Sequence, residues 1–146
     1  MLIILMRSVQ MGRQMNSIKL AFTLFFLLAW SSAANSSDIC NIVRGAYVLA
    51  QDSSNTFLGV IDNKFNSKSI FNDYGDYGSK YSSSSIWNEY GSFGGKFGMY
   101  SPFNSMSINP PMLVQGNNII GYLSSNKSVA NSINPSILRA ICEDKL

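Results

Sequence analysis

Residues 69–104 read SIFNDYGDYGSKYSSSSIWNEYGSFGGKFGMYSPFN, a phrase of aromatic residues and glycines that occurs twice. Aligning Ser69 with Ser85 gives a sixteen-residue period, and this register keeps the asparagine, the acidic residue, the aromatic residues, the glycines and the lysine in equivalent positions. A third copy begins at Ser101 and decays after Asn104. Such retention predicts one structural unit that is repeated about two and a half times.

Two similar stretches flank this repeat, YVLAQDSSNTFLGVI at residues 47–61 and PMLVQGNNIIGYLSS at residues 111–125. Each is a short apolar run, a turn rich in Asp, Asn, Ser or Gly, and a second apolar run, a pattern that is typical of a β-hairpin. The repeat itself contains too many Gly, Ser and Asn residues for helices, so we expect short strands or extended turns there. Its glycines suit tight turns with φ > 0 or the close approach of another segment.

Both ends of this region predict a short helical segment. Asn134 can cap a helix that has Pro135 at its first position. Apolar residues then recur on one helical face, and a similar spacing precedes Gly45, a helix stop signal. The apolar positions are Ile137, Leu138, Ile141 and Cys142 in the second segment and Ile39, Ile42 and Val43 in the first.

The chain has two cysteines, Cys40 and Cys142, one in each of these segments. An even number of cysteines in an exported chain indicates a disulfide, and two cysteines allow one pairing. A redox or metal-binding pair is the alternative, but the chain has neither a CxxC motif nor any histidine. We therefore predict a mostly β fold with much irregular structure, in which two hairpins flank the repeat and one disulfide joins the ends.

The first part of the chain has the pattern of a signal peptide. Lys19 precedes the apolar run LAFTLFFLLAW, and the small residues SSAANSS follow it. This order is typical of a secretory signal with cleavage after Ala34, and the run is too short for an ordinary membrane span. We expect a cleaved segment 1–34 and a single small domain at 35–146, exported to a periplasmic or extracellular location without a permanent membrane span.

The charge of the predicted domain differs from that of the whole chain. Three of the 11 basic residues, Arg7, Arg13 and Lys19, lie in the segment 1–34, whereas all 8 acidic residues lie after it. Residues 35–146 therefore carry no net charge. We therefore expect no nucleic-acid partner, because proteins that bind nucleic acids present a basic surface to the phosphate backbone.

The repeat resembles one found in a family of small exported bacterial proteins. The pattern N-[DE]-Y-G-x-[YF]-G-x-K-[YF], with its neighbouring hairpin and the NPP turn, is similar to their N-x-Y-G-x-Y-G-S-x-Y-S repeats over roughly residues 45–135. Gly95 and Gly98 depart from that pattern where the first copy has Ser79 and Ser82. The resemblance implies a bacterial, exported protein of one domain, and it implies no activity.

The ten aromatic residues between Phe71 and Phe103 allow two interpretations. The favoured one is that the rings fill the core of a small domain, because burying them is its largest available apolar gain. The alternative is a recognition surface, since exposed rings among Asn, Ser and Asp suit a glycan or a peptide. The candidate binding surface consists of Tyr74, Tyr77, Tyr81, Trp87, Tyr90, Lys80 and Lys96.

Enzymatic chemistry finds little support in the sequence. Without histidine, a Ser-His-Asp or Cys-His arrangement is impossible. Asp73 and Glu89 occupy equivalent repeat positions, which favours a recurring structural role, such as accepting backbone N–H bonds, over a catalytic pair. We expect no metal, no cofactor and no catalytic residues. The sequence thus predicts a non-enzymatic binding or cell-envelope interaction module for a glycan or an envelope protein; the alternative is an envelope-active hydrolase or an inhibitor of one.

Overall fold

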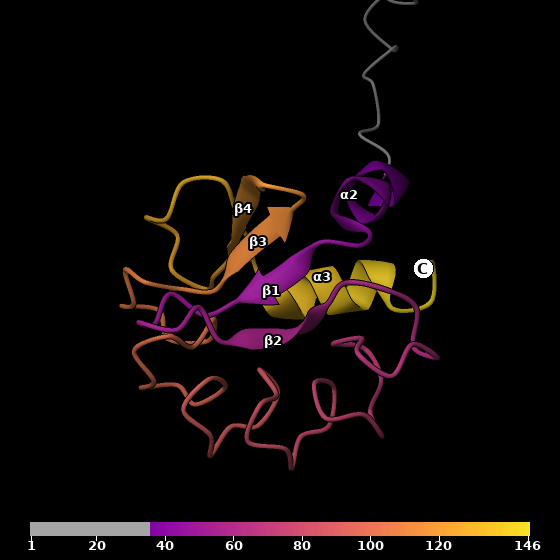
Figure 1. Cartoon of the computed structure of the whole chain (residues 1–146). Coiled ribbons are helices and arrows are strands. Elements are labelled where there is room, and N and C mark those ends of the chain that lie inside the picture. The colour runs from indigo at the N-terminus through magenta and orange to yellow at the C-terminus, as the bar shows by residue number, and fades with distance from the viewer. Residues whose placement is uncertain (1–35) are drawn as a thin grey trace, which may run out of the picture. The chain divides into compact units, whose positions relative to one another are not determined.

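The computed structural model describes residues 36–146 (Figure 1). The predicted signal peptide, residues 1–34, lies outside the described residues, which all belong to one unit. The predicted mostly β fold with much irregular structure is confirmed. Its elements are, in chain order, α2 (Ser36–Val43), β1 (Tyr47–Leu49), β2 (Phe57–Val60), β3 (Met112–Gln115), β4 (Asn118–Leu123), β5 (Ser132–Ile133) and α3 (Pro135–Cys142).

The five strands form one sheet in the order β2-β1-β3-β4-β5. The pairs β1–β2 and β3–β4 are the two antiparallel hairpins that the sequence predicts. Pairing of β1 with β3, which places Val48 opposite Leu113, joins these hairpins into a single sheet. The short strand β5, which the sequence analysis does not predict, adds to β4 in parallel. The repeat is therefore a long excursion that leaves the sheet at β2 and returns to it at β3.

The repeat begins where the chain docks against β2. Ile70 donates its backbone N–H to the Val60 carbonyl, and Val60 in turn donates to the carbonyl of Lys68. Gly59 has φ +120°, and a Cβ atom there would lie 2.8 Å from both Ile70 Cγ2 and Tyr77 Cβ. Only glycine fits this crossing, because a side chain would be strained by the backbone conformation and would also collide with the repeat.

The repeat is a continuous series of tight turns, which Figure 1 draws as curled loops below β2. Almost every turn is closed by a backbone N–H that donates to the carbonyl three residues earlier, and one turn in each full copy spans four residues instead. Four three-residue steps and one four-residue step account for the sixteen-residue period. The junctions between turns in the two full copies are Ser69, Asn72, Gly75, Ser79, Ser82, Ser85, Asn88, Gly91, Gly95, Gly98 and Ser101.

Small polar side chains at the junctions stabilise these turns. The Ser85 hydroxyl accepts the backbone N–H of Trp87 at 3.1 Å, and the Asn88 Oδ1 atom accepts that of Tyr90 at 3.1 Å. Such bonds are the usual reason why Ser and Asn favour turns. The asparagine of each copy also donates its Nδ2 to a carbonyl six residues earlier; the pairs are Asn72 with Asn66, Asn88 with Ser82, and Asn104 with Gly98.

The inward side of the repeat is mainly aliphatic. Ile70 and Ile86 are completely buried, and Pro102 takes the same place in the third copy. The serine before each of them is also buried, so the Ser-Ile or Ser-Pro pair marks the point at which each copy enters the core. Phe71 is the one fully buried aromatic residue of the repeat and joins Val48, Leu58, Ile61, Leu113, Leu123 and Leu138 in this core, while the half-buried rings of Trp87, Phe93 and Tyr100 pack against it.

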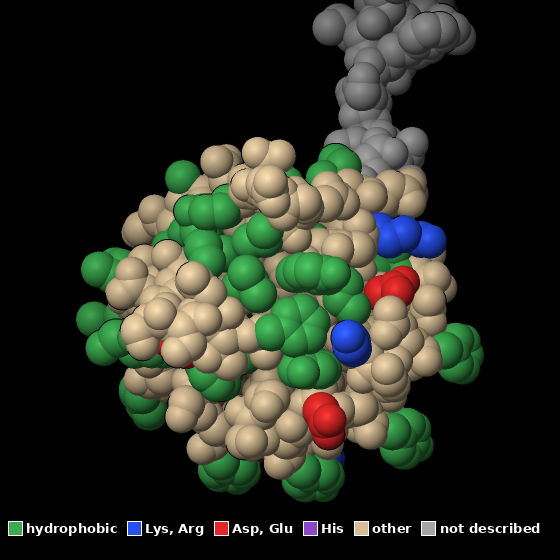
Figure 2. Space-filling model, in the orientation of Figure 1, with side chains coloured by type: hydrophobic (Ala, Val, Ile, Leu, Met, Phe, Trp, Pro, Cys, Tyr) green, Lys and Arg blue, Asp and Glu red, His purple; other side chains and the backbone are tan. Residues whose placement is uncertain are grey.

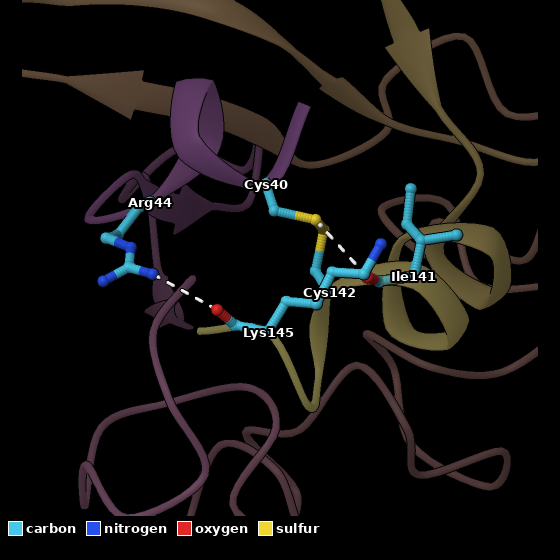
Figure 3. Close-up of a disulfide and its surroundings, with 5 residues drawn as sticks. All are labelled: Cys40, Arg44, Ile141, Cys142 and Lys145. Carbon is cyan, nitrogen blue, oxygen red and sulfur yellow. Dashed lines mark hydrogen bonds between the residues drawn. A yellow bond between two sulfur atoms is a disulfide. The ribbon is translucent and has the colours of Figure 1, made fainter. Parts of the chain in front are cut away.

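The two predicted terminal helices form and carry the disulfide. Asn134 caps α3 by accepting the backbone N–H groups of Ser136 and Ile137 through its side chain. Gly45 ends the turn after α2 with φ +77°. Figure 3 shows Cys40 of α2 bonded to Cys142 of α3, so the predicted disulfide is confirmed. Within residues 36–146, no helix combines the length and the apolar character that a membrane crossing requires.

Candidate functional site

Of the eight large apolar or aromatic side chains that are exposed between Phe65 and Ile108, six recur at equivalent positions of the repeat. They fall into two sets, each following the sixteen-residue period, and every member is between 82% and 101% exposed. In the Lys-aromatic set each ring follows a lysine, and in the acid-tyrosine set each side chain follows Asp, Glu or Ser. The Lys-aromatic set is Phe65, Tyr81 and Phe97, and the acid-tyrosine set is Tyr74, Tyr90 and Met106.

The space-filling view shows how these side chains are presented. In Figure 2 hydrophobic side chains stand out from the outline of the molecule along its left, lower and right edges, and the lower edge is where Figure 1 draws the loops of the repeat. Single exposed hydrophobic side chains are normal on a protein surface, but here they recur at two equivalent positions of a repeat, and this regularity favours an interaction surface. Hydrophobic side chains therefore protrude along the edge of the molecule where the repeat lies.

The favoured interpretation, in which the repeat rings fill the core, is wrong for four of the ten. Tyr74, Tyr81, Tyr90 and Phe97 are exposed, five further rings are half-buried, and Phe71 alone is buried. The physical reason lies in the turns. Each turn series buries its serine and the aliphatic residue after it, so the rings of the second and fourth turns of a copy face outward.

The end of the first copy and the start of the second form a hollow, here called the central hollow, of about 690 Å³. Two exposed tyrosines, Tyr81 and Tyr90, line it together with Lys80 and Glu89. Lys80 Nζ lies 5.2 Å from the centroid of the Tyr81 ring, which is within the range of a cation–π contact. Asn88 also lines the hollow, but both ends of its amide are already bound to the backbone, so it positions Tyr90.

Trp87 lines the same hollow and is held rigidly. Its indole N–H donates to the Ile70 carbonyl at 2.5 Å, and its ring lies 5.7 Å from that of Phe103. On α3, the guanidinium of Arg139 lies 4.7 Å from the Trp87 ring centroid. The first, second and third copies of the repeat thus meet at Trp87, which gives the hollow a fixed wall.

Arg139 connects this wall to two carboxylates. Its Nη2 atom lies 2.5 Å from Asp73 Oδ1 and 2.8 Å from Glu143 Oε1. Burial lowers the pKa of the Arg139 guanidinium, but the hydrogen bonds to Glu143 and Asp73 outweigh it and raise the pKa above its ordinary value. Arg139 is therefore always charged, and the charge is largely neutralised inside the fold.

The structure brings together four of the seven predicted surface residues, Lys80, Tyr81, Trp87 and Tyr90. Tyr74 and Lys96 are exposed but do not line the central hollow. Tyr77 packs against the sheet instead, with its ring 5.0 Å from that of Phe57 in an edge-to-face contact. The seven predicted residues therefore do not form one surface: four line the central hollow, two are exposed outside it, and one packs against the sheet.

The two equivalent acids do not share a structural role, so that expectation is wrong. Asp73 binds Arg139, whereas Glu89 lines the central hollow and accepts no backbone N–H in the described part of the chain. The turn-stabilising bonds come instead from the neighbouring asparagines. No group of three or more His, Cys, Asp or Glu side chains gathers within residues 36–146 in a way that could hold a metal ion.

Sequence reasoning missed two members of the outward-facing sets, Phe65 and Met106. Residues 63–66 read NKFN and match SKYS and GKFG of the two full copies, so the repeat begins earlier than Ser69. The turns also continue to Ser107 in the third copy, which places Met106 in register with Tyr90. The signal that could have revealed both is the spacing of junction residues every three positions.

We compared the chain with protein-family models, with curated proteins and with solved structures, and none of the three comparisons found a significant match.

Proposed function

We propose that this chain is an exported, non-enzymatic binding module of the bacterial cell envelope and that the outward-facing side chains of the repeat contact its ligand. The observation that carries the proposal is the exposure of six large side chains at two recurring repeat positions. A ring exposed at the same position of each copy contributes little to the core, whereas equivalent rings could contact successive units of one ligand.

A glycan is the ligand class that suits this surface best. Tyrosine and tryptophan rings offer flat apolar faces to sugar rings, while nearby hydroxyl, amide and carboxylate groups can hydrogen-bond sugar hydroxyls. The repeat supplies both kinds of group, since its rings alternate with Ser, Asn, Asp and Lys. A polymer also matches a surface with equivalent positions, because several weak contacts along one chain add up to useful affinity.

A lipid membrane fits the same side chains less well. Rings that insert into a bilayer need to lie in one plane, with basic residues around them. The exposed hydrophobic side chains in Figure 2 instead follow a curved edge, and Asp or Glu precedes two of the three members of the acid-tyrosine set. An envelope protein is the other partner that the rings could contact.

One structural observation and two sequence features support export. The Cys40–Cys142 disulfide is of a kind that persists in oxidising compartments. The predicted signal peptide at residues 1–34 and the resemblance of the repeat to that of small exported bacterial proteins point the same way. A non-enzymatic role is supported by the different surroundings of Asp73 and Glu89, of which the first is engaged by Arg139.

Retention on insoluble polysaccharides tests the proposal. Purified protein is mixed with peptidoglycan, chitin or cellulose, sedimented and quantified, alongside a variant with Tyr74→Ser, Tyr81→Ser, Tyr90→Ser and Phe97→Ser. Because these side chains are exposed, we expect the variant to keep its urea midpoint and to lose retention. A matched control, Ile119→Ser, removes an exposed apolar side chain from β4 and should change nothing.

The outcomes separate the partner classes. Retention that the ring variant abolishes and the control preserves supports the proposal. If the ring variant is retained as well as the Ile119→Ser control, the exposed rings are not the binding surface. If no polysaccharide retains the native protein, a glycan is not the ligand. Binding to vesicles of phosphatidylglycerol and phosphatidylethanolamine without binding to polysaccharides would replace the glycan with a membrane.

A further inference from the structure

The three repeat copies present the same pattern but leave different charged groups available. Counted from the lysine instead of the serine, the three copies begin at Lys64, Lys80 and Lys96, and each places a Lys-aromatic pair and, nine residues later, an acid-tyrosine pair or its remnant. In the first copy both charges are engaged by the C-terminal part of the chain. Lys64 Nζ lies 3.0 Å from Asp144 Oδ1, and Asp73 Oδ1 lies 2.5 Å from Nη2 of Arg139.

The third copy has lost half of the pattern. Lys96 and Phe97 are kept, but Ser105 stands where the other copies have an acid, and Met106 stands where they have a tyrosine. The second copy alone combines a lysine and an acid, Lys80 and Glu89, that form no ion pair with any of the described residues. It also has tyrosine rather than phenylalanine or methionine at both outward-facing ring positions, Tyr81 and Tyr90.

This second copy contains the central hollow. Its lining residues include these four side chains, which come from turns nine residues apart in the sequence. A hollow of about 690 Å³ is within the size range of small-ligand sites, so one sugar unit of a longer chain fits its volume. The wall formed by Trp87 is fixed by the bond to Ile70 and by Arg139.

We propose that the central hollow is a subsite for a sugar unit that bears a carboxylate, with Lys80 pairing with that carboxylate and Tyr81 and Tyr90 stacking on the sugar. This inference rests on the proposed glycan-binding function. The ammonium group of Lys80 is the only cationic group among the described residues that line the hollow. An ammonium–carboxylate hydrogen bond is stronger than one between neutral groups, so the lysine favours an acidic sugar over a neutral one.

Glu89 complements this selection. A carboxylate accepts two or more hydrogen bonds, and the hydroxyl groups of a sugar donate them. Because Glu89 repels a second carboxylate, the acidic group of the ligand is directed toward Lys80 and the hydroxyl groups toward Glu89. The two flanking copies then make secondary contacts through their exposed rings, and the acidic sugar is selected in the central hollow.

Calorimetric titration with paired oligosaccharides tests the inference. The probes are soluble oligomers that contain galacturonic, glucuronic or muramic acid, each matched with the same oligomer after reduction of its carboxyl groups. We expect at least one acidic oligomer to bind more tightly than its reduced counterpart. Lys80→Met, which keeps the apolar stem and removes the charge, should weaken the acidic oligomer about fivefold and leave the neutral one unchanged.

Three control variants locate the effect. Lys96→Met removes the equivalent lysine of the third copy and should change affinity by less than about twofold, because its copy lacks the acid and the second tyrosine. Lys80→Arg keeps the charge and should retain the preference for the acidic oligomer. Tyr90→Ser should weaken the acidic and the neutral oligomer to a similar extent, because stacking does not depend on the carboxylate.

Each of the following outcomes would contradict one part of the proposal. Equal binding of every acidic oligomer and its reduced counterpart overturns the inference and leaves the glycan-binding function intact. Equal losses in Lys80→Met and Lys96→Met overturn the assignment to the central hollow. If no oligomer binds and no insoluble polysaccharide retains the protein, the proposed function itself fails.

Discussion

The guanidinium of Arg139 lies over the ring of Trp87, 4.7 Å from its centroid, and so fastens the last helix, α3, to the second repeat copy. The same side chain binds Asp73 in the first copy and Glu143 at the end of α3. The helix itself is attached to α2 by the disulfide. One arginine thus connects the turn series to the part of the chain that the disulfide secures.

Replacing Arg139 with methionine should destabilise the protein by about 1–2 kcal/mol, since it removes a cation–π contact and two partly exposed ion pairs while keeping the apolar stem. Urea unfolding followed by circular dichroism measures this change. Lys127→Met, an exposed lysine in the loop after β4, is the matched control and should leave the midpoint in place. An Arg139 variant as stable as the native protein would show that the connection contributes nothing.

Gly94 should tolerate no side chain, unlike the nearby Gly91. A Cβ atom at Gly94 would overlap the Asn88 carbonyl oxygen and lie 2.6 Å from that of Ile86, whereas at Gly91 the nearest atoms would be 3.3 Å away, in the Asn88 side chain. Backbone carbonyls cannot move aside without breaking the turn. We expect Gly94→Ala to cost about 2 kcal/mol or more and Gly91→Ala less than about 1 kcal/mol. Equal urea midpoints for the two variants would contradict the close turn packing.

The disulfide should account for a large share of the stability. Cys40 and Cys142 are 102 residues apart in sequence, and loss of a cross-link of that length lowers the free energy of unfolding by up to about 4–5 kcal/mol. Urea unfolding with and without reductant measures the difference. The double variant Cys40→Ala, Cys142→Ala should match the reduced protein and be insensitive to reductant. Intact mass before and after thiol labelling provides the check, and two reactive thiols in exported protein would contradict the prediction.

Asp62 should make the stability depend on acid pH. The hydrogen bond from the Asn66 side chain, at 2.6 Å, and those from Asn63 hold the pKa of Asp62 below its ordinary value of 3.8. Because folding lowers this pKa, the ionised carboxylate stabilises the folded state above about pH 3.8, and the contribution is lost as the pH falls through the lower folded value.

The variant Asp62→Asn removes that contribution. Its urea midpoint should fall below that of the native protein at pH 6, and the gap should narrow at pH 2.5. Asp76→Asn, an exposed acid in the repeat, is the control and should keep the native pH dependence. A gap between the native protein and Asp62→Asn that stays constant across this range would show that the carboxylate charge is not what stabilises the loop.

Several features of the fold follow from local chemistry and were predictable. The two hairpins depend on short apolar runs around Asx and Gly turns, and both form. The cap at Asn134 and the stop at Gly45 bound the two terminal helices, which bring Cys40 and Cys142 together. The glycines of the repeat permit close approach, as at Gly78 and Gly94, where a Cβ would strike the backbone of the preceding asparagine, but none within residues 69–104 has a positive φ, so that alternative is wrong.

The candidate site was predictable only in part. The repeat register identified Lys80, Tyr81, Trp87 and Tyr90 as residues of interest, and these line the central hollow. Nothing in the register distinguished them from Tyr77, whose ring packs on Phe57 because the chain crosses β2 nearby. Contacts of this kind depend on segments far apart in the sequence, and a repeat gives no information about them.

The sequence by itself determined the turns and their period. Each turn closes through a backbone bond over three or four residues, and where the junction is Ser or Asn its side chain adds a bond to the backbone two residues on, so neighbouring residues suffice. The tertiary structure decided which rings remain outside and which charges remain available. Burial of Ile70 and Ile86 against the sheet orients the turns, and docking of the C-terminal segment engages Lys64 and Asp73 while leaving Lys80 and Glu89 in the hollow.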